Sequence, residues 1–149
     1  MVNPFDPRTV LLAKHAQHVV LIHFPIALFL SGFLFDLAAQ AKRGSFDAVA
    51  YYNVTLAAVF AVPTVISGVL AWHWQLEGRR IHGVLLLHIL FAASATVLIL
   101  ATAFLHWLAR RRQDRDWRRI RISLEALAAI SIALAAHLGG FVSGVNSTF

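Results

Sequence analysis

The sequence predicts an all-α integral membrane protein, an up-down bundle of four transmembrane helices that forms a single domain over residues 1–149. Hydrophobic residues make up 59% of the chain and charged residues 13%, with a mean hydropathy of +0.70, whereas a soluble domain has roughly a quarter of its residues charged. Four long apolar runs are separated by short charged stretches, and a helix of about 20 apolar residues spans the hydrocarbon core of a bilayer. Short connections make sequential helices antiparallel neighbours.

The four apolar runs predict spans at about residues 19–39, 48–72, 81–108 and 120–142. The spans and their connections account for the chain, so any chemistry is expected among the helices or at their ends. No soluble repeat or low-complexity tract is visible. The tryptophans fall at the span ends, as is typical of the aromatic belts at a membrane–water interface: Trp72, Trp74, Trp107 and Trp117.

The basic residues predict the orientation of the chain, because cytoplasmic loops carry an excess of lysine and arginine. Nine of the 13 basic residues flank the connections after the first and third spans, and four lie on the other side. We therefore expect the connections after the first and third spans in the cytoplasm and both termini on the outer side of the membrane. The nine residues are Lys42, Arg43, Arg110, Arg111, Arg112, Arg115, Arg118, Arg119 and Arg121.

The composition excludes several classes of function. The chain has no cysteine, which excludes disulfides, iron–sulfur clusters, thiolate zinc sites and covalently attached c-type haem. The sequence pI of about 11.1 is explained by membrane topology, so no nucleic-acid partner is expected. No Ser/His/Asp order, phosphate-binding loop or HExxH motif is present. Enzymatic catalysis therefore has little support in the sequence, and a non-catalytic subunit is favoured.

Eight histidines are unusual in so short and apolar a chain, and seven of them lie toward the predicted outer face. His23, His88 and His137 lie about five to seven residues inside their spans, or about 6–10 Å below the surface. An imidazole at that depth usually faces the bundle interior and marks a functional site. Four others are expected to be interfacial residues that tolerate the headgroup region: His15, His18, His73 and, at the inner end, His106.

A b-type haem explains imidazoles that come from different helices at one depth. Two neutral imidazoles on facing helices ligate the iron, and apolar side chains enclose the ring. His82 and His88 point about 120° apart on one helix, so they cannot ligate the same iron, and this allows for one haem b or two. Arg79 and Arg80 can pair with the propionates at the nearer surface. The best candidate ligands, in order, are His23, His88, His137 and then His82.

Two other interpretations stay open. A structural or assembly subunit without its own cofactor would use the histidines to hydrogen-bond between helices, and its arginine-rich segment 109–121 to bind anionic lipid or a partner. A histidine-based metal site for transport or sensing would need a polar path to the inner face, where polar groups are few. Asp36 and Glu125 lie toward that face, where they can form a proton-handling or quinone-binding site or snorkel to the interface.

The first span resembles the opening of the DUF2231 proteins, a family of bacterial membrane proteins. The resemblance rests on His18, on the HFPIAL motif of residues 23–28 and on the FDL of residues 35–37. It continues in ISGVLAW before the second connection, in HGVLLLH of the third span and in the closing HLGGFVSGVN. There the family commonly has a leucine, a valine and an aromatic residue in place of residues 141–143. The resemblance implies a four-helix membrane protein that binds haem or serves a redox complex. It also implies a location in the bacterial cytoplasmic (inner) membrane, so that both termini are expected on the periplasmic side.

Together these observations predict a membrane cytochrome b-like subunit. It would hold haem b near the outer face and relay electrons between an external redox partner and the quinone pool. Because short connections offer little surface for a soluble substrate, we expect the chain to lie in the lipid bilayer beside other subunits of a larger redox complex.

Overall fold

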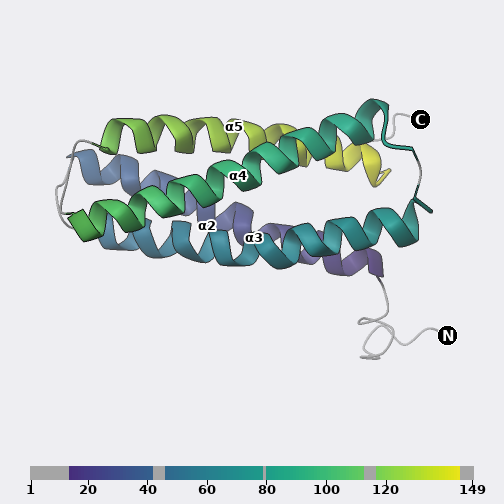
Figure 1. Ribbon diagram of the computed structural model, residues 1–149, viewed down its shortest axis with the longest axis horizontal. Helices are drawn as coiled ribbons and strands as arrows, with labels where there is room; N and C mark the ends of the chain where they lie inside the picture. Colours follow the sequence, from purple (N-terminus) through teal and green to yellow (C-terminus); the bar gives the residue numbers. More distant parts are fainter. Residues whose placement is uncertain (1–13, 42–45, 79, 113–116, 145–149) are drawn as a thin grey trace.

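The computed structural model describes residues 14–41, 46–78, 80–112 and 117–144. These residues form four helices and no strand: α2 (Lys14–Ala41), α3 (Asp47–Gln75), α4 (Gly83–Arg112) and α5 (Arg118–Val142). All four are long and apolar enough to cross a membrane, and they run up and down beside one another (Figure 1). The predicted four-helix membrane bundle is confirmed.

Each helix extends a few residues beyond the apolar run that predicted it at one end or both, although α4 begins two residues later than predicted, at Gly83. The first span was expected at residues 19–39, for example, whereas α2 covers Lys14–Ala41. Hydropathy marks only the residues that lie in hydrocarbon, whereas helical hydrogen bonding continues into the headgroup region. The turn after α3 has Glu77 and Gly78 in the left-handed region, with φ values of 49° and 63°. The Gly78 amide donates to the Trp72 carbonyl there, which satisfies one of the carbonyl groups left without a helical partner at the end of α3.

The bundle consists of two hairpins. The first hairpin pairs α2 with α3 and the second pairs α4 with α5, and the contacts within each hairpin are far more extensive than those between the hairpins. We call the end where α3 leads into α4 the outer end, after the predicted orientation, and the opposite end the inner end. The backbones of the first hairpin approach closely at Gly32, where a Cβ atom would lie 2.7 Å from Val54 Cγ2.

The apolar core occupies the inner half of the bundle. In α2, α3 and α4, no described residue on the outer side of Pro25, Ala61 and Ala95 is buried. Figure 1 shows α3 and α4 separated at the end where the two termini lie and closer together toward the other end. The bundle is therefore packed at its inner end and splayed at its outer end. The core residues are Phe29, Val54, Ala57, Ala95, Ile99, Ala128 and Ile132.

The two hairpins present the same register of positions to the core, although no repeat is visible in the sequence. The buried positions 25, 29, 32 and 36 of α2 recur 70 residues later in α4, at 95, 99, 102 and 106. The buried positions 50, 54, 57 and 61 of α3 recur 71 residues later in α5, at 121, 125, 128 and 132. The residue types differ at all of these corresponding positions except 57 and 128, which are both alanine, and this is why the correspondence is apparent only in three dimensions.

Candidate functional site

Two histidines in the outer half, His18 and His88, lie on the buried faces of their helices. Each precedes a buried residue, Pro25 or Ala95, by seven positions. Seven residues make about two helical turns, so each histidine points within about 20° of the buried residue that follows it. They lie about 6–8 Å from the outer ends of α2 and α4 at 1.5 Å per residue. The two imidazoles therefore occupy equivalent places in the two hairpins.

His88 is bonded across the second hairpin to the backbone of α5. Its Nδ1 lies 2.9 Å from the carbonyl oxygen of Ala135, and the side chain is half-buried. A carbonyl oxygen can only accept, so Nδ1 carries the proton and donates this bond. In the neutral ring the lone pair then lies on Nε2, the nitrogen that a metal ion would take.

His18 is bonded across the first hairpin in the same way. Its Nδ1 lies 2.9 Å from Ser67 Oγ, and the Ser67 hydroxyl donates to the carbonyl oxygen of Thr64 at 2.8 Å. A serine hydroxyl has one hydrogen, so Ser67 Oγ accepts from His18 Nδ1. The ring of His18 therefore has the same tautomer as that of His88.

A glycine on the partner helix makes room for each ring. A Cβ atom at Gly68 would lie 3.0 Å from His18 Cε1, and one at Gly139 would lie 3.1 Å from His88 Cε1. The two glycines are 71 positions apart, the offset that relates α3 to α5. At each imidazole a hydrogen bond and the close approach of a glycine restrict the rotation of the ring.

The deeper candidates His23 and His137 face away from the buried stripes. Each lies two residues from a buried position, Pro25 or Ala135, and so points about 200° away from it on the helix. His23 is exposed and its Nδ1 bonds to Val19 O on its own helix at 2.6 Å. His137 is exposed and its ring lies edge-on to Phe141, with 5.2 Å between the ring centroids. The position of a histidine along its predicted span gives its depth in the membrane but not the direction in which its side chain points.

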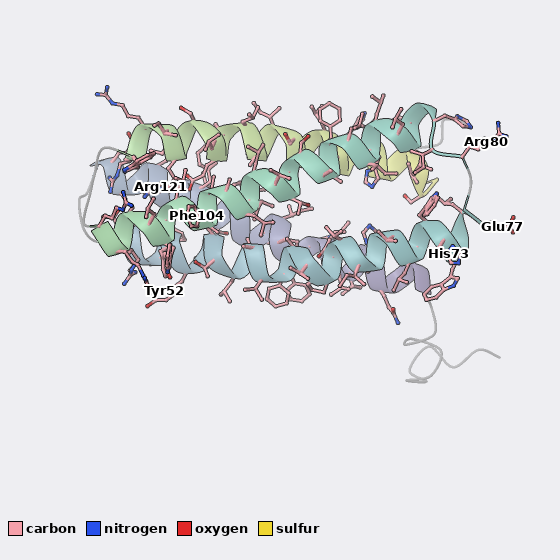
Figure 2. The ribbon with its side chains drawn as sticks, in the orientation of Figure 1. Tyr52, His73, Glu77, Arg80, Phe104 and Arg121 are labelled. Carbon is pink, nitrogen blue, oxygen red and sulfur yellow. The ribbon has the colours of Figure 1, made fainter. Side chains whose placement is uncertain are left out.

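The remaining predicted residues lie at the outer end. His82 is exposed and directly precedes α4, and Arg80 is exposed in the connection between α3 and α4 (Figure 2). Arg79 lies outside the described residues. Arg80 is therefore placed where an anionic group at the outer surface can meet it.

A second polar group lies buried at the inner end, and its first component is an ion pair between α2 and α5. Arg121 Nε donates to Asp36 Oδ2 at 2.7 Å, and Nη2 donates to Asp36 Oδ1 at 2.5 Å. Both side chains are buried. Arg121, at the inner end in Figure 2, was counted among the loop arginines in the sequence but lies inside α5.

The second component is a bond between His106 of α4 and Glu125 of α5. His106 Nε2 lies 2.7 Å from Glu125 Oε1, and both residues are buried. The other oxygen, Glu125 Oε2, is buried and has no hydrogen-bond partner among the described residues. We call Asp36, His106, Arg121 and Glu125 the buried quartet.

The quartet corrects two expectations from the sequence. Asp36 and Glu125 do not snorkel to the interface, since both are completely buried. His106 is not an interfacial residue but part of the same buried group. One signal in the sequence indicated this arrangement: Arg121 and Glu125 are four residues apart and therefore lie on one face of a helix.

The quartet also has the composition of a metal site. Three possible ligand atoms, one each from Asp36, His106 and Glu125, lie within 4.8 Å of one another. Both oxygens of Asp36, however, already accept hydrogen bonds from Arg121. The arrangement therefore suits a proton better than a divalent metal.

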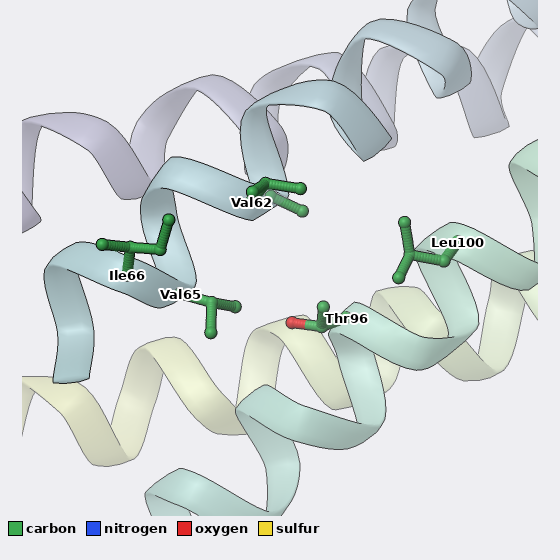
Figure 3. A pocket seen from close by; sticks show the side chains of 6 residues that line it. Val62, Val65, Ile66, Thr96 and Leu100 are labelled. Carbon is green, nitrogen blue, oxygen red and sulfur yellow. The ribbon is translucent and has the colours of Figure 1, made fainter.

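An apolar recess lies between the hairpins near the middle of the bundle. Its volume is about 220 Å³, and it is open to the surroundings of the bundle. Figure 3 shows side chains of α3 and α4 lining it from opposite sides. Thr96 supplies its only hydroxyl among the lining residues, which are Ala61, Val62, Val65, Ile66, Thr96 and Leu100.

A comparison with protein families identifies the chain. The family model described as predicted membrane protein (DUF2231) matches residues 14–146, which include all four helices. The chain belongs to the DUF2231 family. The resemblance inferred from the HFPIAL motif is thus confirmed. No curated protein and no solved structure matches the chain. The DUF2231 description gives a membrane location and no activity, so a function must be argued from the two polar sites.

Proposed function

We propose that this DUF2231 protein is a cytochrome b-like membrane subunit that would hold haem b between its two hairpins, with His18 and His88 as the residues that would bind its iron. The proposal rests on the equivalent helix positions and hydrogen bonds of these two imidazoles. Each faces inward from a different hairpin, and each donates from Nδ1 to a fixed oxygen. Metal-bound histidines typically make this hydrogen bond, which orients the ring and raises the basicity of Nε2. Bound haem would supply one-electron redox chemistry.

The splayed outer half supports the proposal. The side chains there are apolar and are not covered by other parts of the described chain; Val65 and Val84, which lie on the same helix faces as the buried stripes, are 46% and 44% exposed. A flat apolar macrocycle between the hairpins would cover such surfaces, while its propionates would reach the outer surface near Arg80. The glycines at positions 68 and 139 allow the two ligand rings to pack closely against α3 and α5.

The proposal revises the ranking of ligands that the sequence suggested. His88 is retained, and His18 replaces His23 and His137 as its partner because these two point away from the buried stripes. His23 and His137 are candidate ligands for a second haem. Because they face outward, a second haem would lie against a neighbouring subunit of the redox complex.

The location of the ligands indicates where each redox partner could approach the haem. In the proposed orientation, with both termini on the periplasmic side of a bacterial inner membrane, His18 and His88 lie near the outer face, where an external redox partner can approach. The apolar recess between α3 and α4 opens to the bundle surroundings, so a quinone could exchange electrons laterally from the lipid.

A visible spectrum tests the proposal. The full-length protein, purified in detergent from haem-replete cells, is expected to show the sharp α-band of bis-histidine haem b in a dithionite-reduced minus oxidised spectrum. His18→Ala and His88→Ala should each abolish or shift this band. His23→Ala and His137→Ala are the matched controls and should retain the band of the inward-facing haem.

The structural-subunit alternative predicts a different result. In that case His18 and His88 only join the helices of each hairpin, and their replacement lowers stability without removing a chromophore. A flat spectrum together with an empty metal analysis of the wild-type protein would rule out the haem proposal.

A further inference from the structure

We propose that the buried quartet is a proton-binding site, in which the His106–Glu125 pair holds one exchangeable proton. This inference rests on the inner end of the bundle alone and does not depend on haem at the outer end. It assigns a function to four polar residues that the proposed electron-transfer role leaves unexplained.

The quartet is electrically neutral only if it holds one proton more than the ordinary ionisation states of its four side chains provide. Arg121 and Asp36 cancel each other through their two hydrogen bonds. An ionised Glu125 beside a neutral His106 would leave one net negative charge completely buried, and an uncompensated buried charge is strongly unfavourable. One added proton makes the quartet neutral, whether it lies on the imidazole or on the carboxyl group.

The geometry provides a place for that proton. The 2.7 Å separation of His106 Nε2 and Glu125 Oε1 is that of a hydrogen bond, so a hydrogen lies between the two atoms in both protonation states. Glu125 Oε2 is buried without a hydrogen-bond partner among the described residues. This oxygen offers a second position at which a proton can be received or released.

Groups on the other helices set the electrostatic environment of the pair. From α3, the ring of Tyr51 lies 6.5 Å from that of His106, and the guanidinium of Arg110 in α4 stacks over Tyr51 at 4.5 Å. Nearer the inner surface, Arg118 pairs with Asp47. Arg110, Arg118 and Asp47 lie nearer the inner ends of their helices than the quartet does. The inner surface is therefore the nearer source of a proton for Glu125.

A divalent metal fits the quartet less well than a proton does. Binding a divalent cation would require Asp36 to give up hydrogen bonds to Arg121 or to share its oxygens with it. With both carboxylates ionised, a divalent cation together with Arg121 would leave a net charge of about +1 in the buried site, by simple charge counting. A single proton leaves no net charge.

Infrared difference spectroscopy on the full-length protein in lipid tests the inference. We expect a carboxylic C=O stretch that titrates as one step across a pH series, moves to lower frequency in D₂O and is absent in Glu125→Gln. Glu77→Gln is the matched control, because Glu77 is exposed in the outer connection, and it should leave the step unchanged. His106→Gln should shift the midpoint of the step without removing the carboxyl group.

Two results would overturn the inference. One is the absence of any titrating carboxyl band that depends on Glu125. The other is stoichiometric binding of Zn²⁺ or Mn²⁺ in equilibrium dialysis that is lost in Glu125→Gln, which would make the quartet a metal site. If Glu125→Gln does not fold, nitrogen-labelled histidine in the wild-type protein provides the readout: the ring nitrogen shifts of His106 must titrate in the same step.

Discussion

Arg121 and Asp36 join α5 to α2 through two parallel hydrogen bonds of 2.7 and 2.5 Å, and thereby link the two hairpins at the inner end of the bundle. Arg118 adds a bond to the Ala39 carbonyl oxygen and an ion pair with Asp47, both of which also connect α5 to the first hairpin. In the outer half, the bonds of His18 and His88 instead join helices of the same hairpin. The hairpins are therefore held together at the inner end and can diverge at the outer end.

The first prediction concerns this ion pair. Arg121→Met is expected to lower the free energy of unfolding by about 3–5 kcal/mol, because it leaves Asp36 buried without its partner. The double variant Asp36→Leu/Arg121→Met should recover most of that loss, since no unpaired charge remains. Thermal or denaturant unfolding in detergent micelles measures both effects.

The control for this prediction is Arg119→Gln, because Arg119 is exposed on the same helix. Its effect is expected to stay within about 0.5 kcal/mol. Equal stability losses in the Arg119 and Arg121 variants would show that the buried pair does not hold the hairpins together.

The second prediction concerns the contact between Gly139 and His88. A methyl group at position 139 would lie 3.1 Å from His88 Cε1, so Gly139→Ala should displace the ring and cost about 1–3 kcal/mol through overpacking. In a His88→Ala background the same change should cost much less, because the ring is gone. A double-mutant cycle measures the coupling, and additive effects would contradict the observed contact.

The third prediction concerns the packing of the first hairpin. At Gly32 an added Cβ atom would lie 2.7 Å from Val54 Cγ2 and 3.1 Å from Val54 N. Gly32→Ala should therefore separate α2 from α3 and destabilise the protein by about 1–3 kcal/mol. Replacing Val54 with alanine as well should relieve only the side-chain clash, so the rescue is expected to be partial. Unfolding of Ser31→Ala, one residue away, provides the baseline.

The fourth prediction concerns orientation, and the absence of native cysteine makes it simple to test. In intact bacterial cells, Glu77→Cys should react with a membrane-impermeant maleimide that has access to the periplasm, because residue 77 lies in the outer connection. Arg119→Cys, at the inner end, should react only after the cytoplasmic membrane is permeabilised. The reverse pattern would invert the proposed topology and place His18 and His88 near the cytoplasm.

Hydropathy along the chain was sufficient to predict the four helices, their approximate bounds and their antiparallel order. This is because a spanning helix satisfies its backbone hydrogen bonds within itself, so local composition determines where it forms. The HFPIAL motif was likewise sufficient to predict membership of the DUF2231 family. The depth of each histidine also followed from counting residues at a fixed rise per residue.

Only the tertiary structure decided which side chains face one another. Position along a helix gives depth but not direction, and the direction of His18 or His23 becomes known only when the buried stripe of α2 is known. Asp36 and Arg121 are 85 residues apart in the sequence, so no local pattern relates them. Their pairing, and that of His106 with Glu125, arises because an apolar environment makes an unpaired charge unfavourable and the packing of the hairpins brings the partners together.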